Sequence, residues 1–346
     1  MTLQPGSTSL GQMSQTEKRP AVIYVTNGWG VHDIRWAAAL EACRFAVVKC
    51  NDPDEVADLV IEHRAVAVLA GPLFTVTQQI GRLAVPLIGL SWGFDLNEEL
   101  PNLPVSSDTT WLQELSGLIV DSQATREIAL SLGVDPARIW VIPWGVDLEL
   151  FTPNGPTISA VDHGFDNRSR VVLSLRTHDD LYRTVDVIEA FALAAVAAPD
   201  LVLVMGGSGP LTAAHEARIS ELGLSSRVRM IGQIPEADLP SYLRGCDAYL
   251  TASQSDGTSV TMLQAMACGA PIIASANAGN SQWITDGLTG QTFPVGDINA
   301  LAALLVICGR NPKTQSEAES ARELVARQAD WIRNREQLLT IMMPAG

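Results

Sequence analysis

Short apolar runs alternate with longer segments whose apolar residues recur at helical spacing along most of this chain. Near-continuous apolar strands between amphipathic helices are typical of parallel sheets that are covered on both faces. The pattern predicts strands at 21–25, 45–49, 66–70, 86–90, 117–120 and 139–142 and, after a pause, at 171–175, 201–205, 228–231, 248–251, 271–275 and 290–293. We therefore expect an α/β protein with two doubly wound, Rossmann-like domains.

The pause in this pattern covers residues 152–169, which are rich in Pro, Gly, Asn and Ser. Such a composition is typical of a linker, so we expect one domain over 20–151 and a second over 170–323. Ligands of doubly wound sheets bind beyond the carboxyl ends of the strands, which predicts a ligand site in the cleft between the two domains. Residues 1–19 are polar and lack the apolar segment of a secretory signal, so we expect a disordered tail there.

The overall composition narrows the classes of function. The 346 residues are 47% hydrophobic and 18% charged, as expected for a globular protein with large buried sheets. A net charge of −15 and a pI near 4.7 argue against nucleic acid and anionic lipid as partners, since both require a basic surface. The longest apolar runs, such as 300–308, are far shorter than the roughly 20 residues of a spanning helix, so we expect no transmembrane segment.

The five cysteines of the chain lie in apolar segments and form no Cys-x-x-Cys pair. This arrangement favours buried, reduced thiols in a cytoplasmic protein. It does not favour a metal site, because no histidine ligand set lies near them in the sequence.

The clearest functional signal surrounds a helix that we expect to start near Thr258. Asp256 lies directly before this helix, where free backbone N–H groups attract anionic ligands. Gln264 follows eight residues after Asp256, which is about 12 Å along a helix. This separation suits a sugar, a diphosphate and a ribose in one cleft. An ordinary amphipathic helix that stops at Gly269 and Pro271 explains the same pattern without a ligand.

Several motifs resemble the signature of the retaining glycosyltransferases of family 4. Residues 265–271, Ala-Met-Ala-Cys-Gly-Ala-Pro, match the end of that signature, and the turn at 256–260 resembles its beginning. The family signature contains two glutamates; a subgroup carries aspartate at the first, as Asp256 does here, whereas Gln264 departs from the second. Residues 142–153 resemble the motif that closes the family's first domain. The resemblance implies the GT-B fold, in which two Rossmann-like domains enclose an interdomain cleft.

The resemblance also implies cationic groups at the donor. Arg176, at the end of the second domain's first strand, matches the family arginine, and Arg183 lies near the position of the family lysine. In the family these cations stabilise the diphosphate as it leaves, and guanidinium groups suit phosphate oxygens. The turn at 206–210 resembles the family's Gly-x-Gly-Pro, so Gly207 is expected beside the nucleotide, although tight packing explains a glycine turn equally well.

The start of the predicted helix is assigned to the donor by the same resemblance. Asp256 is expected to orient the hydroxyls of the donor sugar, while the N–H groups of Gly257, Thr258 and Ser259 meet the sugar or the phosphate. The second glutamate of the family accepts hydrogen bonds from the ribose hydroxyls. Gln264 is therefore expected at the ribose.

In the first domain, Gly28 and Gly30 resemble the family's glycine loop, which faces the diphosphate and the acceptor. Trp92 stands where many members carry a histidine that contacts the donor sugar. His32 and Asp33 follow the glycine loop, and a pair at the start of a helix is more typical of capping than of catalysis.

Together these resemblances imply an enzyme, a glycosyltransferase of EC class 2.4. It moves a sugar from a nucleoside-diphosphate sugar to an acceptor hydroxyl with retention of configuration. They imply no metal and no cofactor besides the donor substrate, and we expect a small or soluble acceptor. They also imply that a C-terminal helix at about 324–346 crosses back onto the first domain.

Two other functions fit parts of the sequence. A catalytically silent GT-B protein that binds a nucleotide sugar or a partner explains the departures at Trp92, at Gln264 and at the missing lysine. A nicotinamide-dependent oxidoreductase explains Gly28 and Gly30 after the first strand, but Asp33 occupies the third glycine position of that fingerprint.

Overall fold

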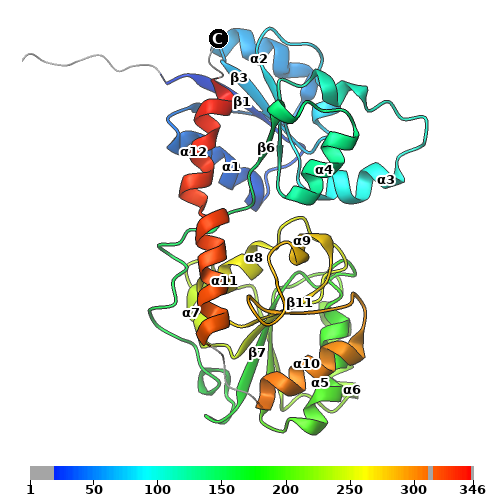
Figure 1. Ribbon diagram of the computed structural model, residues 1–346, viewed down its shortest axis with the longest axis vertical. Coiled ribbons are helices and arrows are strands. Elements are labelled where there is room, and N and C mark those ends of the chain that lie inside the picture. The colour runs from blue at the N-terminus through cyan, green and yellow to red at the C-terminus, as the bar shows by residue number, and fades with distance from the viewer. Residues whose placement is uncertain (1–18, 311–314, 344–346) are drawn as a thin grey trace, which may run out of the picture.

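The structure is a computed structural model that describes residues 19–310 and 315–343. Two lobes, each built on a six-stranded sheet, lie one above the other along the longest axis (Figure 1). Every predicted strand coincides with an observed strand to within one residue at either end. The prediction of two doubly wound, Rossmann-like sheets is therefore confirmed. The tail predicted at 1–19 lies outside the described residues except for its last residue.

The first lobe has the strand order β2-β1-β3-β4-β5-β6, and all of its strand pairs are parallel. Its strands are β1 (Ala21–Val25), β2 (Ala46–Cys50), β3 (Ala67–Ala70), β4 (Leu87–Leu90), β5 (Gly117–Val120) and β6 (Ile139–Val141). Its α-helices are α1 (Val31–Ala42), α2 (Val56–His63), α3 (Leu100–Asn102) and α4 (Gln123–Ser131). Shorter turns of helix are η1 (Pro53–Glu55), η2 (Thr77–Gln79), η3 (Asp95–Glu99), η4 (Thr110–Glu114) and η5 (Pro136–Arg138).

The second lobe has the order β12-β11-β10-β7-β8-β9, again with parallel pairs only. Its strands are β7 (Arg170–Leu175), β8 (Leu201–Gly206), β9 (Val228–Gly232), β10 (Ala248–Thr251), β11 (Ile272–Ser275) and β12 (Gln291–Phe293). Its helices are α5 (Thr184–Ala197), α6 (Thr212–Glu221), α7 (Leu239–Gly245), α8 (Val260–Ala267), α9 (Ala278–Ser281), α10 (Ile298–Arg310) and α11 (Gln315–Gln328), with η6 (Val161–His163) before β7.

Helices cover both faces of the second sheet because its strands are apolar on both sides. Successive residues of a strand point to opposite faces. Val172 of β7 therefore packs with Phe191 of α5 and Leu301 of α10, whereas Leu173 packs on the other face with Leu263 of α8. This two-sided burial is the physical reason for the near-continuous apolar strands in the sequence.

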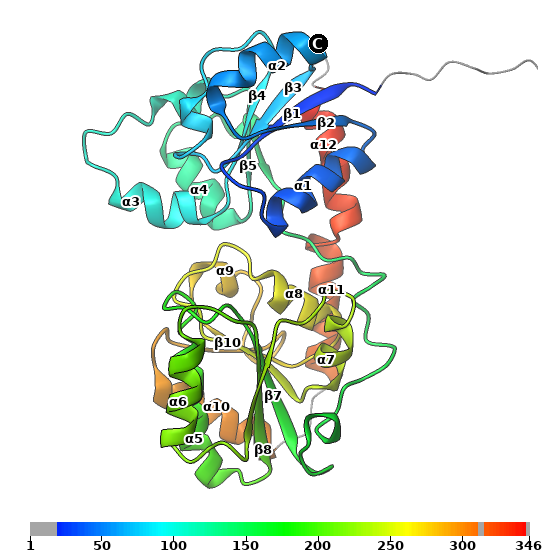
Figure 2. The ribbon, with the colours of Figure 1, turned by 180° about the vertical axis from the view of Figure 1, so that it is seen from behind.

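The chain returns from the second lobe to the first at residues 329–330. α11 lies along the second lobe and α12 (Trp331–Met342) along the first (Figures 1 and 2). The Val146 N–H donates to the Ala329 carbonyl at 2.7 Å, and the Trp331 N–H donates to the Val146 carbonyl at 3.0 Å. A Cβ at Gly145 would lie only 2.8 Å from the Cα of Trp331. The glycine of the predicted boundary motif is therefore required where the two crossing segments meet.

Two predicted helix starts differ from the observed ones. α12 begins at Trp331 rather than at about 324, because the Asp330 carboxylate caps it by accepting hydrogen bonds from the backbone N–H groups of Ile332 and Arg333. α8 begins at Val260 rather than near Thr258, because Ser259 has extended backbone at the N-cap. In the described part of the chain, no helix combines the length and the apolarity that crossing a membrane requires.

Candidate active site

Three adjoining cavities share lining residues, and two of them are lined by both lobes. The glycine-loop cavity, of about 230 Å³, is lined by Leu175, Arg176, Tyr182, Gly206, Gly207 and Thr261 among others. The aromatic cavity, of about 400 Å³, is lined by His32, Trp92, Phe94, Glu98 and Trp144 from the first lobe and by 181–182 and 255–258 from the second. The helix cavity, of about 660 Å³, is lined by residues that include His32, Arg35, Asp147, Thr261, Gln264 and Trp331. Shared lining residues join the three cavities into one interdomain cleft.

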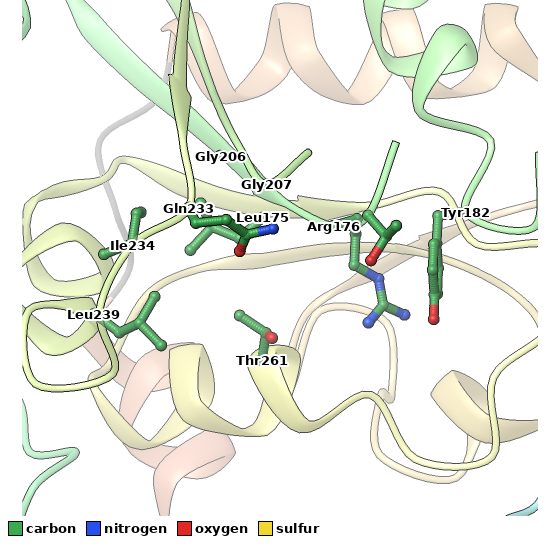
Figure 3. A pocket seen from close by; sticks show the side chains of 10 residues that line it. Leu175, Arg176, Tyr182, Gly206, Gly207, Gln233, Ile234, Leu239 and Thr261 are labelled. Carbon is green, nitrogen blue, oxygen red and sulfur yellow. The ribbon is translucent and has the colours of Figure 1, made fainter. Parts of the chain in front are cut away.

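An ion pair lies inside this cleft. Arg176 directly follows β7 and pairs with the carboxylate of Asp256, which lies in the turn before α8. The guanidinium also donates to the Ser253 hydroxyl, from Nη2 at 2.8 Å and from Nε at 3.2 Å. It lies 4.5 Å from the centre of the Tyr182 ring, beside which it extends in Figure 3. The Arg176 and Asp256 side chains are only 10% and 15% exposed, so water screens the pair weakly.

Arg183 is placed differently from Arg176. It stands at the start of α5, and its Nε donates to the Asp186 carboxylate at 2.7 Å. It does not belong to the lining of the three cavities. The structure therefore does not bring Arg183 together with Arg176 and Asp256, and its role at the diphosphate stays a prediction.

The glycine-loop cavity owes its shape to two glycines after β8. Gly207 has a φ of +107°, and a Cβ there would overlap the carbonyl oxygen of Arg176. Figure 3 shows Gly206 and Gly207 on one side of the cavity and Thr261 of α8 on the other. Only glycine lets the two backbone segments pass this closely. Gly207 thus lies beside Arg176, where the sequence predicts a nucleotide contact.

Gln264 lies on α8 and faces the helix cavity. Its side chain is 6% exposed, and it shares the cavity lining with Thr261, one helical turn earlier. Its amide forms no hydrogen bond with any residue in the part of the chain that the structure describes. The amide is therefore available to a ligand that enters the cleft.

The turn before α8 also joins the two lobes. The Thr258 hydroxyl donates to the backbone carbonyl of Asp121 at 3.1 Å, and a Cβ at Gly257 would overlap the Asp121 carboxylate. Asp121 is fully buried, and this burial raises its pKa to about 6. Gly257 and Thr258 line the aromatic cavity, whereas the buried Ser259 lines none of the three cavities.

The glycines of the first lobe lie outside these cavities. Gly28 is exposed, and a Cβ there would meet nothing within 4 Å. The Gly30 N–H donates to one Asp33 carboxylate oxygen at 2.9 Å, and the Tyr24 hydroxyl donates to the other at 3.1 Å. Asp33 therefore caps α1, as the sequence indicates, and a donor contact at Gly28 or Gly30 stays a prediction.

A buried carboxylate fixes the turn that carries Trp92. Asp95 accepts hydrogen bonds from the Ser91 hydroxyl at 2.5 Å and from the backbone N–H groups of Leu96 at 2.9 Å and of Leu73 and Trp92 at 3.2 Å. Burial raises the pKa of Asp95, while these hydrogen bonds oppose the shift. Trp92 is thereby held at the wall of the aromatic cavity.

Most of this aromatic wall is not evident from the sequence. No motif singles out Phe94, Glu98 or Tyr182, and Trp144 lies within the motif at 142–153 that resembles the family's domain boundary. Trp144 is only 5% exposed, and it belongs to the core of the first lobe while also lining the cavity. The sequence does place Trp92 and Trp144 shortly after β4 and β6. This position indicates a ligand contact, because ligands of such sheets bind beyond the carboxyl ends of the strands.

Comparison with known sequences finds matches to the second half of the chain. Residues 158–325 match the sequence model of the family described as glycosyl transferases group 1. The chain is 32% identical over 225 residues to D-inositol 3-phosphate glycosyltransferase of Mycobacterium sp. (strain JLS), which covers 63% of this chain and 50% of the relative. The protein of the same name from Mycobacterium bovis (strain BCG / Pasteur 1173P2) is 29% identical over 217 residues, 60% of this chain and 45% of the relative. The chain spans about half the length of the curated relatives that it matches.

Comparison with solved structures covers both lobes. Anabaena HepE in complex with UDP has a TM-score of 0.72 at 18% identity, over 93% of this chain and 98% of that chain. Sucrose-phosphate synthase from Thermosynechococcus elongatus has a TM-score of 0.74 at 19% identity, over 92% of this chain and 97% of that chain. The predicted GT-B fold is confirmed.

Proposed function

We propose that this chain, whose residues 158–325 match the model of the group 1 glycosyl transferases, is an enzyme that transfers a sugar from a nucleoside-diphosphate donor to an acceptor hydroxyl. The observation that supports this most strongly is the ion pair between Arg176 and Asp256 inside the interdomain cleft. A UDP-sugar is the first donor to test, since the Anabaena neighbour HepE binds UDP and UDP-glucose.

Arg176 would stabilise the diphosphate as it leaves. Its Nη2 and Nε are engaged with Asp256 and Ser253, whereas its Nη1 donates no hydrogen bond to the residues that the structure describes. A guanidinium carries five N–H donors in a planar fork, so the N–H groups of Nη1 are left for a phosphate oxygen. A cation that the fold holds in place before reaction stabilises developing charge without reorganisation.

Asp256 and the turn after it would hold the donor sugar. Asp256, Gly257 and Thr258 line the aromatic cavity, next to the ion pair. The carboxylate accepts hydrogen bonds from sugar hydroxyls, and the backbone N–H groups before α8 suit a polar or anionic ligand. We propose retention of configuration through attack on the face from which the diphosphate departs. The bond from the sugar to the diphosphate breaks, the bond to the acceptor oxygen forms, and the acceptor proton goes to the leaving phosphate oxygen.

The direct test uses purified protein with a panel of UDP-, GDP- and dTDP-sugars. Thermal shift identifies the nucleotide that binds, and release of the nucleoside diphosphate then reports turnover. We expect Asp256→Ala to abolish turnover, because the donor sugar loses its hydroxyl acceptor. Turnover that survives this substitution would contradict the assigned role of Asp256.

Gln264→Glu is expected to tighten donor binding about tenfold, because hydrogen bonds to a charged group contribute roughly 1.5–3 kcal/mol against 0.5–1.5 for neutral partners. The carboxylate would accept from the ribose hydroxyls at a position where the present amide lacks a partner. Calorimetric titration with the nucleoside diphosphate measures the change. Unchanged or weaker binding would show that Gln264 does not lie at the ribose.

A second candidate is a catalytically silent protein that binds a nucleotide sugar. It is favoured by Gln264 in place of an acidic residue and by the position of Arg183 outside the three cavities. The same assays separate the two candidates. A nucleotide-dependent thermal shift without release of diphosphate, for every donor and acceptor tested, would favour the silent protein.

The proposal includes a cytoplasmic location. Four cysteines are buried and Cys308 is half-buried. Buried thiols that stay reduced are usual in that compartment.

A further inference from the structure

The aromatic cavity lies where an acceptor would meet the donor sugar. Its second-lobe wall is the turn at 255–258, which includes Asp256 of the ion pair. Its first-lobe wall comes from the start of α1, from the turn after β4 and from the turn after β6. If the sugar of the proposed donor lies against Asp256, the first-lobe wall faces the group that attacks it. The chemistry of this wall therefore selects the acceptor.

The first-lobe wall is mostly aromatic. The ring of His32 lies 4.2 Å from that of Trp144 and 5.9 Å from that of Trp92. The rings of Trp92 and Phe94 are 6.5 Å apart in an edge-on arrangement. Asp95 accepts a hydrogen bond from the Trp92 backbone N–H, which fixes the turn that carries Trp92. Aromatic faces bind flat apolar surfaces of ligands and attract cations.

The charge of the cavity is negative. None of its described lining residues is lysine or arginine, and Asp256 is neutralised by Arg176. The carboxylate of Glu98 remains, and it forms no salt bridge with the residues that the structure describes. His32 adds no positive charge at neutral pH, because burial and then Arg35 lower its pKa.

We infer that the acceptor is a polyhydroxylated ring that carries an ammonium group and no phosphate, seated against the aromatic rings of the first-lobe wall with its ammonium toward Glu98. This inference rests on the proposed function, and it specifies the substrate class of the same site. A phosphate group requires arginine or lysine partners, which this wall does not supply. An ammonium group gains both the attraction of the ring faces and that of the carboxylate. The relatives from Mycobacterium are named for a phosphate-bearing acceptor, so the inference separates this chain from them.

The test is a binding measurement on the 346-residue chain saturated with UDP. Glucosamine, glucose, N-acetylglucosamine and glucose 6-phosphate are titrated separately and followed by tryptophan fluorescence, with ligand-observed NMR as a second readout. Glucosamine and its N-acetyl form differ in charge at the nitrogen, and glucose provides a neutral ring without the acetyl group. We expect glucosamine to bind about 5–10-fold more tightly than either neutral ring, and glucose 6-phosphate to bind most weakly.

A matched pair of variants tests whether the aromatic cavity is the cause of the preference for glucosamine. Glu98→Gln keeps the shape of the side chain and removes its charge, and we expect it to abolish the preference for glucosamine. Glu41→Gln makes the same change on the exposed side of α1, and we expect it to keep the preference. Glu41→Gln should also bind UDP as the parent does.

The outcomes separate this inference from the proposed function. A protein that does not bind UDP or any other nucleoside diphosphate contradicts the proposed function itself. A protein that binds UDP but prefers glucose 6-phosphate, treats glucosamine like glucose, or does not bind glucosamine overturns the inference alone. A preference for glucosamine that persists in Glu98→Gln overturns it as well.

Discussion

Replacing Arg176 with alanine is expected to lower the rate of sugar transfer by about 10²–10³-fold, the usual loss when one preorganised donor to a developing negative charge is removed. The substitution removes the cation that we assign to the leaving diphosphate and that now pairs with Asp256. Steady-state release of the nucleoside diphosphate measures the effect. Arg168→Ala is the matched control, because the Arg168 side chain is 84% exposed and pairs with nearby Asp166.

A structural effect of Arg176→Ala must be separated from a catalytic one. The Asp256 side chain is only 15% exposed in the present structure. Without Arg176 its carboxylate loses the paired cation, which we expect to destabilise the fold by about 1–3 kcal/mol. Adding Asp256→Asn to Arg176→Ala removes the unpaired charge and should restore most of the stability without restoring turnover. Recovery of turnover in the double variant, or full activity in the single variant, would contradict the assigned role of Arg176.

Gly207→Ala is expected to destabilise the protein by about 2–4 kcal/mol, from left-handed backbone strain of about 1 kcal/mol and steric overlap of about 1–3 kcal/mol. Gly207 has a φ of +107°, and its added Cβ would overlap the Arg176 carbonyl oxygen. Because that backbone carries the Arg176 side chain, nucleotide binding should weaken as well. Denaturant unfolding measures the stability change, and titration with UDP measures the binding.

Gly223→Ala is the matched control for the steric part of this effect. Gly223 also has a positive φ, +68°, but a Cβ there would meet nothing within 4 Å. We expect it to cost only about 1 kcal/mol and to leave UDP binding unchanged. If the two alanine variants lose the same stability, the close approach of Gly207 to Arg176 is not what requires glycine there.

The strands and the fold class could be predicted from the sequence because strands that are buried on both sheet faces appear there as short apolar runs. Residues such as Val172 and Leu173 face opposite cores, so both must be apolar, and the strand appears as an uninterrupted apolar run. The placement of Arg176 and Asp256 at one site could also be anticipated. Each follows the carboxyl end of a strand in the same sheet, β7 and β10, and these strands are neighbours.

Contacts between distant segments are what the tertiary structure alone decided. In the sequence, Arg176 matches the family arginine and Arg183 lies near the family lysine, but Arg183 pairs with Asp186 on its own helix and Arg176 faces the cleft. The partnership of Gly145 with Trp331 exists only where the chain crosses back between the lobes. The aromatic wall combines α1 with the turns after β4 and β6, which are adjacent only in the folded lobe. The spacing of apolar residues indicates which residues are buried, but it does not indicate which distant side chains contact them. The helices and strands of this protein were therefore determined by its sequence pattern, and the contacts of its site residues by packing between segments that are distant in the sequence.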